Sequence, residues 1–268
     1  MGKFDGVLLC TDYDDTFCTA TGEVPRANQE AVAYFKAQGG RFTVATGRAH
    51  NTFAPHVHLA GINAPAVLSN GSQLYDFDLG EMLVDVCLPR SCREELGPLQ
   101  AAFPGMGMEA YHEGVMYIVG RNAWVDRHIA KVKVGGEETP LGAIPLPWGK
   151  AIFMAEHHDL LSVQGHILAR WGEKYEAIFS NPHMLEITAK GCNKGGMVLA
   201  LARRLGIERK DIYCVGDNQN DLPMLAVSAI PFAPANCARE VRDWGARILC
   251  HCEEGAIAAL IAELDKIY

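Results

Sequence analysis

The stretch GVLLCTDYDDT, residues 6–16, contains the first predicted strand and a cluster of acidic residues. A short, continuous apolar run between a glycine and an aspartate is typical of a fully buried strand. Three carboxylates follow this run within four positions, Asp12, Asp14 and Asp15, and no basic residue stands beside them in the stretch. Because unpaired negative charges packed together are costly, we expect a cation to lie at the end of this strand.

Strands and helices alternate in both end regions of the chain. The elements predicted in the N-terminal region are a helix at 24–40, a strand at 41–46, a helix-like return at 47–61 and a short strand at 65–71. Those predicted in the C-terminal region are helices at 193–207, 220–228, 236–245 and 253–267 and strands at 211–217, 229–233 and 246–250. Such alternation is typical of βαβ units. We therefore predict an α/β fold with a Rossmann-like, doubly wound parallel sheet.

The middle of the chain has a different pattern. Its predicted elements are strands at 81–89, 150–156, 174–180 and 183–189, helices at 90–103 and 158–172, two strands within 107–120 and a Pro- and Gly-rich loop at 136–150. This order favours an α+β domain with a mainly antiparallel sheet. We predict a core domain formed by residues 1–82 and 188–268, with an inserted domain at 83–187.

The composition of the 268-residue chain is that of a globular protein, with 49% hydrophobic and 21% charged residues. A net charge of −8 gives no basic surface for nucleic acid and no polybasic patch for a membrane. No apolar stretch approaches the roughly 18 residues that span a bilayer. Several of the nine cysteines lie in apolar runs, as in VLLC (7–10), which favours reduced thiols and a cytoplasmic protein. The oligomeric state stays open.

Four polar clusters stand at predicted strand ends or helix starts: DYDDT (12–16), TGR (46–48), Lys194 and GDNQND (216–221). In an open parallel sheet, ligands bind outside the carboxyl ends of the strands, so we expect these clusters to meet at one edge. Oxygen ligands without His or Cys favour a hard ion, and Mg²⁺ is the usual one beside phosphates. One carboxylate can attack phosphorus, another can transfer protons, and a lysine and a hydroxyl can hold phosphoryl oxygens.

These clusters resemble, in order and spacing, the four signature motifs of the haloacid dehalogenase superfamily of phosphatases. The long insert between the second and third motifs resembles the type IIB cap of the Cof-like sugar-phosphatase branch. LSNGSQLYD (68–76) and the ending at 236–261 resemble the same branch. The resemblance covers nearly the whole core and implies an HAD-like core with an α+β cap at 83–187.

The resemblance also implies roles for individual residues. The catalytic residues are Asp12 as nucleophile and Asp14 as general acid and base. The phosphate-binding residues are Thr46, Gly47, Lys194 and Asn220, the last touching phosphate or the waters of the metal. The Mg²⁺ ligands are Asp12, the Asp14 carbonyl and Asp217, supported by Asp221.

Two further residues of the motifs are assigned structural roles only. Arg48 is interpreted as holding the loops of the site. At Asp15 the family most often has glycine, and because aspartate tolerates turn geometry we assign Asp15 no chemical role.

The residues favour Mg²⁺-dependent hydrolysis of a small phosphorylated metabolite through a phospho-aspartyl intermediate, and the resemblance implies a sugar or polyol phosphate as the substrate. A phosphomutase with the same chemistry is the main alternative. A non-catalytic ligand-binding protein of the same fold is disfavoured because no site residue is missing, and a dehalogenase is disfavoured because it needs no metal. Tyr111, His112 and Trp148 are candidates for contacting the substrate from the cap, and the sequence does not choose among them.

Overall fold

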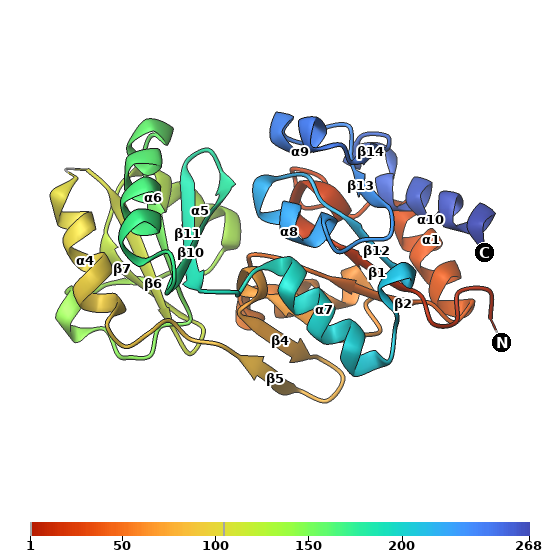
Figure 1. Cartoon of the computed structure of the whole chain (residues 1–268), viewed down its shortest axis with the longest axis horizontal. Coiled ribbons are helices and arrows are strands. Elements are labelled where there is room, and N and C mark those ends of the chain that lie inside the picture. Colours follow the sequence, from red (N-terminus) through yellow and green to blue (C-terminus); the bar gives the residue numbers. More distant parts are fainter. Residues whose placement is uncertain (1, 104) are drawn as a thin grey trace. The chain divides into compact units, whose positions relative to one another are not determined.

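The computed structural model describes residues 2–103 and 105–268. The chain divides into two units. In Figure 1 the first unit has the colours of both ends of the scale, red to orange and cyan to blue, and the second has the yellow and green colours between them. The first unit comprises the residues up to Arg48 together with Phe53–Val84 and Asn193–Tyr268. The second comprises Ala49–Thr52 and Asp85–Cys192.

A sheet of five parallel strands, in the order β14-β13-β12-β1-β2, lies at the centre of the first unit. Its strands are β1 (Leu8–Thr11), β2 (Arg41–Val44), β12 (Ile212–Val215), β13 (Pro231–Ala233) and β14 (Arg247–Ile248). The predicted α/β fold class is confirmed by this parallel sheet and its flanking helices. Because Thr11 lies opposite Val215, the segments that leave β1 and β12 emerge side by side at one edge of the sheet.

Helices cover both faces of this sheet, as Figure 1 shows for α7 and α10. The helices of the first unit are α1 (Arg26–Ala37), α3 (Val57–Ala60), α7 (Lys194–Leu205), α8 (Leu222–Leu225), α9 (Arg239–Trp244) and α10 (Ala256–Ile267), and α2 (His50–Phe53) spans the boundary between the two units along the chain. Leu9 of β1 packs in one core with residues of α1 and α10, whereas Leu8 and Cys10 pack in another with residues of α7 and α8. Side chains alternate across a strand, so the continuous apolar run of β1 serves two helical layers.

The predicted helix-like return at 47–61 is shorter and broken. The structure has α2, a 3₁₀ turn at Ala54–His56, and then α3. Proline at position 55 has no backbone N–H to donate, and this favours the break.

A small sheet of three strands, β3 (Ala66–Leu68), β4 (Gln73–Asp76) and β5 (Glu81–Asp85), completes the first unit. A parallel bridge between Ala45 and Val67 joins β3 to the end of β2. The predicted strand at 65–71 is too long, because Ser69, Asn70 and Gly71 all have positive φ and form a turn. Strand β4 has no counterpart among the predicted elements.

The second unit has a six-stranded sheet in the order β10-β11-β9-β6-β7-β8. Its strands are β6 (Gly107–His112), β7 (Val115–Gly120), β8 (Glu137–Glu138), β9 (Lys150–Met154), β10 (Tyr175–Asn181) and β11 (Met184–Ala189), and its helices are α4 (Cys92–Ala102), α5 (Ala123–Val132) and α6 (His157–Trp171). The pairs are antiparallel except β7 with β8. Leucines of α4 and α6 share a core with Phe153 of β9, whereas Val125 of α5 packs in a separate cluster with Ile152. The mainly antiparallel sheet agrees with the prediction for this segment.

Two features of the second unit lie outside the predicted elements. Helix α5 has no counterpart in the prediction, although Asn122 caps it by accepting the N–H groups of Trp124 and Val125. Strand β8 lies in the segment predicted as a loop, where it extends the edge of the sheet beside β7.

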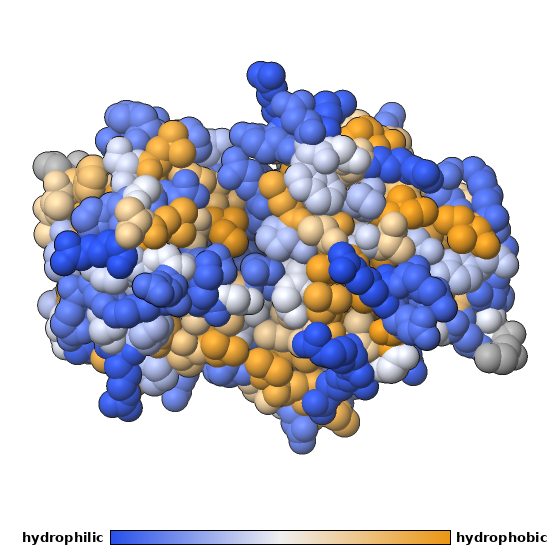
Figure 2. Space-filling view, viewed as in Figure 1, coloured by the Kyte–Doolittle hydropathy of each residue, from blue (hydrophilic) through white to orange (hydrophobic). Residues whose placement is uncertain are grey.

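Hydrophilic and hydrophobic residues are intermingled over the face seen in Figure 2. Among the residues that the structure describes, no helix combines the length and the apolar character needed to cross a bilayer.

Candidate active site

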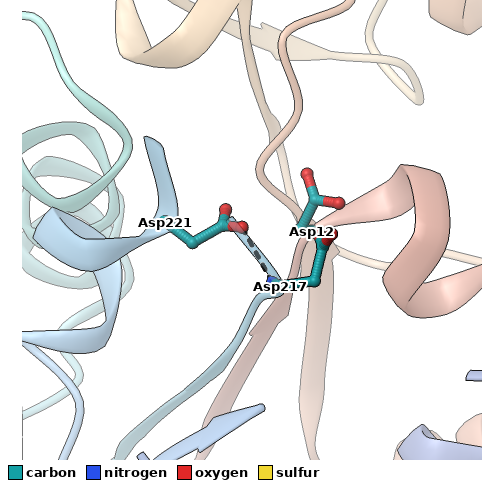
Figure 3. Close-up of side chains that lie close together, drawn as sticks. All are labelled: Asp12, Asp217 and Asp221. Carbon is teal, nitrogen blue, oxygen red and sulfur yellow. Dashed lines mark hydrogen bonds between the residues drawn. The ribbon is translucent and has the colours of Figure 1, made fainter. Parts of the chain in front are cut away.

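Three aspartates converge where β1 and β12 end. Asp12 follows β1 directly and is bound to β12 by its N–H, which donates to the Val215 carbonyl at 2.9 Å. Asp217 follows β12 after Gly216, and Asp221 lies in the 3₁₀ turn Gln219–Asp221. One carboxylate oxygen of each aspartate lies within 4.8 Å of those of the other two. Figure 3 shows the three side chains around a common point.

Lys194 is the cation already present among these carboxylates. It is the first residue of α7, its side chain is fully buried, and its Nζ donates to Asp12 Oδ1 and to Asp221 Oδ1, each at 2.6 Å. Burial lowers the pKa of this amine, but the two carboxylates outweigh that effect and the pKa is raised. The lysine therefore stays charged, and three carboxylates face one ammonium group.

The pKa values of two carboxyl groups show that this compensation is incomplete. Burial raises the pKa of Asp12 well above its usual value; Lys194 opposes the shift, whereas Asp221 and Asp217 add to it. Burial and then the charge of Asp221 raise the pKa of Asp217 to about 7. A further cation would remove this cost, and a set of carboxylate oxygens suits a hard divalent ion such as Mg²⁺. Asp12, Asp217 and Asp221 therefore fit a metal site.

Hydrogen bonds orient the two aspartates that follow β12. Asp221 Oδ2 accepts the backbone N–H groups of Asp217 at 2.9 Å and of Asn218 at 3.0 Å, and Figure 3 shows the first of these bonds as a dashed line. Thr16 Oγ1 donates to Asp217 Oδ1 at 3.0 Å. The backbone of GDNQND therefore curls around the Asp221 side chain. Thr16, from the first motif, fixes the orientation of Asp217 in the last motif.

Gly216 is required by this close winding. A Cβ atom at position 216 would lie 2.3 Å from Cγ of Asp221, far inside van der Waals contact. A side chain there would displace Asp221.

Asp14 lies in the same turn as Asp12 but has a different partner. Arg48 forms two parallel hydrogen bonds with it, Nε to Oδ2 at 2.9 Å and Nη2 to Oδ1 at 2.8 Å. Burial lowers the pKa of the Arg48 guanidinium, but the bonds and the charge of Asp14 outweigh this and raise it. Such a two-pronged pair fixes the orientation of the carboxylate. Arg48 does more than hold loops, because it positions the carboxyl group of the predicted acid and base.

Asp15 adopts the left-handed conformation, with φ 61° and ψ 9°. Glycine adopts this conformation without strain, and aspartate is among the residues that tolerate it best. The carbonyl of Asp15 accepts a hydrogen bond from Asn236 at 2.7 Å. These contacts agree with a role in the turn.

Thr46 and Asn220 are linked by Asn70, which is not among the predicted site residues. Thr46 is buried at the end of β2, its hydroxyl accepts the N–H of Arg48 at 3.2 Å, and Gly47 follows it. The Thr46 carbonyl accepts the N–H of Asn70 at 3.0 Å, and Asn220 Nδ2 donates to Asn70 Oδ1, also at 3.0 Å. The signal available in the sequence was the Asn-Gly pair after a strand, which marks a turn.

The structure brings the predicted site residues together in three connected groups. Asp12, Lys194, Asp217 and Asp221 contact one another directly, Asp14 is held by Arg48, and Thr46 and Asn220 are linked by Asn70. Of the cap candidates, Trp148 is fully buried in the core of the second unit, and the Tyr111 hydroxyl donates to Glu109 at 2.7 Å. The contact of the Asp14 carbonyl with a metal stays a prediction.

Comparison with known proteins agrees with the family that the four motifs resemble. A family model described as haloacid dehalogenase-like hydrolase matches residues 9–261. An HMP-PP phosphatase from Serratia proteamaculans is 24% identical over 269 residues, covering 95% of this chain and 90% of the relative. An HMP-PP phosphatase from Escherichia coli is 24% identical over 258 residues, covering 94% of this chain and 93% of the relative.

Solved structures share the fold over nearly the full length. A haloacid dehalogenase-like hydrolase from Bacteroides thetaiotaomicron has a TM-score of 0.82 at 21% identity and covers 96% of this chain and 99% of its own. An HAD subclass IIB sugar phosphatase has a TM-score of 0.85 at 18% identity, with coverage of 97% and 99%.

Since the family model spans most of the chain, the protein belongs to the haloacid dehalogenase-like hydrolases. Within that family the curated relatives carry the name phosphatase, as the four motifs lead us to expect for this chain.

Proposed function

We propose that the protein is a Mg²⁺-dependent phosphatase that hydrolyses a small phosphorylated metabolite, a sugar or polyol phosphate, through a phospho-aspartyl intermediate. The observation that carries the proposal is the arrangement of Asp12, Asp217, Asp221 and Lys194 at one edge of the parallel sheet. The raised pKa of Asp12 supports a bound cation, because a nucleophilic carboxylate must be ionised.

In the first half of the reaction, an oxygen of Asp12 forms a bond to phosphorus while the bond from phosphorus to the ester oxygen breaks. Asp14 gives its proton to the leaving oxygen, and the alcohol departs. In the second half, Asp14 takes a proton from water, whose oxygen attacks phosphorus and releases Asp12. The two hydrogen bonds from Arg48 orient the Asp14 carboxyl group when it is ionised, which is the state in which it takes a proton from water.

Charge is held by residues around the reacting phosphoryl group. Thr46, the Gly47 backbone, Lys194 and Asn220 bind its oxygens in this proposal, and Lys194 neutralises charge that develops on them. Asp12, Asp217 and the Asp14 carbonyl would hold Mg²⁺, with Asp221 supporting the set. The ion supplies electrostatic stabilisation of the transferring group.

The first test measures release of phosphate from p-nitrophenyl phosphate with and without Mg²⁺. We expect activity with the ion, loss of activity in EDTA, and loss in Asp12→Asn with the fold retained. Asp15→Asn is the matched control, because it makes the same change of charge three residues away, and it should stay active. Full activity of Asp12→Asn would contradict the assignment of the nucleophile. Activity that survives EDTA would instead favour a metal-independent reaction such as dehalogenation.

The second test identifies the substrate with a panel of phosphorylated metabolites ranked by kcat/KM. The panel contains sugar and polyol phosphates, and HMP-PP because the curated relatives are named for it. We expect a sugar or polyol phosphate to rank first, with free phosphate as product. An isomerised sugar phosphate as product would favour the phosphomutase. Binding without turnover of any member would favour a ligand-binding protein.

A further inference from the structure

The turn that follows β3 connects the chain segments of three site motifs. Its residues Ser69, Asn70 and Gly71 have φ values of 49°, 54° and 93°, all in the left-handed region. Non-glycine residues rarely adopt this region, and two in succession indicate a conformation that the surrounding structure imposes. Such residues concentrate at functional sites.

Backbone contacts tie the turn to the second and third motifs. The N–H of Asn70 donates to the Thr46 carbonyl at 3.0 Å, and the N–H of Ser69 donates to the Arg48 carbonyl at 2.9 Å. A Cβ at Gly71 would lie 2.2 Å from the Asn193 carbonyl oxygen and 2.8 Å from the Lys194 nitrogen. The turn therefore lies directly against the start of α7, where Lys194 begins the helix.

The side chain of Asn70 supplies the connection to the fourth motif. It is buried, with 6% of its surface exposed, and its Oδ1 accepts a hydrogen bond from Asn220 Nδ2 at 3.0 Å. Its own Nδ2 is buried and has no hydrogen-bond partner among the described residues. A buried donor without a partner costs stability, so a requirement of stability alone does not explain an asparagine at this position.

We infer that Asn70 is a positioning residue for phosphoryl transfer, which holds the amide of Asn220 in place beside Thr46 and Lys194. This inference rests on the proposed phosphatase function. Asn70 acts through Asn220, since the bond between the two side chains is its polar side-chain contact in the described structure. Its backbone bond to Thr46 would persist in Asn70→Gly, because glycine keeps the N–H and adopts the positive φ without strain.

The test is a double-mutant cycle of Asn70→Gly, Asn220→Ala and the double variant, with p-nitrophenyl phosphate and Mg²⁺. Asn70→Gly should lower kcat/KM by about 10- to 100-fold, because small misplacement of a positioned group has effects of that size. The double variant should be no worse than Asn220→Ala alone, since coupled residues are not additive. The inhibition constant of inorganic phosphate should rise in parallel in all three variants.

Thermal stability separates positioning from a general structural role. Glycine adopts a positive φ without strain and removes the unpaired Nδ2, although it leaves Asn220 Nδ2 without its acceptor. The Tm of Asn70→Gly should therefore stay within about 3 °C of the parent value. Ser69→Gly is the matched control, because Ser69 has the same backbone conformation but donates to Gln73 at 3.0 Å, and it should keep its activity.

The outcomes are distinguishable. Activity of Asn70→Gly equal to that of the parent, additive losses in the cycle, or a loss of activity that follows a matching loss of Tm would each overturn the inference while leaving the phosphatase intact. A parent protein that neither hydrolyses aryl phosphate nor binds inorganic phosphate with Mg²⁺ would overturn the proposed function and this inference with it.

Discussion

At the scale of single residues, Lys194 has the largest electrostatic role in the site. Its ammonium group contacts Asp12 and Asp221 with no exposure to solvent. Removing one partner of a buried ion pair leaves uncompensated charge, which costs about 3–5 kcal/mol. We predict that Lys194→Met lowers the free energy of unfolding by about this amount and abolishes phosphatase activity, as measured by urea denaturation and phosphate release.

Lys190→Met is the control for that variant. Lys190 is 52% exposed in its side chain and lies 3.4 Å from Glu176, an arrangement that contributes little to stability. A Lys194→Met protein as stable as Lys190→Met would contradict the electrostatic account of the site.

The contact of Arg48 with Asp14 shows which features of the site can be predicted from the sequence and which cannot. The motifs identify Asp12, Asp217, Asp221 and Lys194 because each stands at a strand end or helix start, and the parallel sheet brings such positions together. The partner of Asp14 depends on the direction of a long side chain, which local sequence does not set. The role of Asn70 depends on a turn conformation that asparagine and glycine permit but do not dictate.

At the scale of elements, the turn after β12 determines where Asp221 stands. Because a Cβ on Gly216 would overlap the Asp221 side chain, we predict that Gly216→Ala lowers kcat at least tenfold and reduces Tm. Gly165→Ala is the opposite case. Gly165 lies inside α6 with open space at its Cβ, so alanine should stabilise the protein by about 1 kcal/mol without affecting kcat. Equal effects of the two substitutions on kcat would contradict the close winding of the turn.

Strands β9 and β11 hold a buried ion pair in the second unit. Lys150 Nζ lies 3.0 Å from Glu186 Oε2, and both side chains are 5% exposed. Burial opposes ionisation of Glu186, but the charge and hydrogen bond of Lys150 outweigh it and lower the pKa of that carboxyl below its ordinary 4.5. Because folding lowers this pKa, the contribution to stability is present above about pH 4.5 and is lost as the pH falls below it.

We predict that Glu186→Gln destabilises the protein at pH 7 by about 3–5 kcal/mol and that the difference from the parent shrinks below pH 4.5. Urea denaturation at several pH values measures both effects. Glu137→Gln changes an exposed glutamate in the same sheet and should leave stability nearly unchanged. A pH-independent difference would show that the charge of Glu186 is not the cause.

Whole elements could be predicted from the sequence where the hydrophobic pattern is strong. The parallel core follows from buried runs such as 7–10 that alternate with amphipathic helices. Helix α5 was not predicted, although Val125, Ile129 and Val132 recur at helical spacing and pack in one cluster, so its pattern was present in the sequence. The break in residues 47–61 lies at Pro55, which the sequence shows, whereas the two-residue strand β8 depends on pairing with β7 that a pattern of single residues does not contain.

At the scale of the whole molecule, the cluster of carboxylates links stability to metal and pH. Folding raises the pKa of Asp217 from 3.8 to about 7, and raises that of Asp12 as well. The folded chain therefore binds more protons than the unfolded chain in this window, and this contribution to stability is lost as the pH rises from about 4 to about 7.

Mg²⁺ competes with those protons, so we predict that it raises Tm more at pH 8 than at pH 5. Differential scanning fluorimetry in EDTA and in saturating MgCl₂, at matched ionic strength, makes the measurement. Asp217→Asn should reduce the shift at pH 8. A Tm that does not respond to saturating Mg²⁺ at pH 8 would contradict the metal site.

The contacts of Lys194 have a consequence for the order of assembly. In small metal domains that fold only around their ion, a chelator is a denaturant. Here the Lys194 amine already joins Asp12 at the end of β1 to Asp221 in the turn after β12. We therefore expect the chain to fold before it binds an ion. We predict that withdrawal of the ion leaves a folded but inactive protein, and that its return restores activity without refolding. On the proposed function, the availability of the metal would set how much of the folded protein is active.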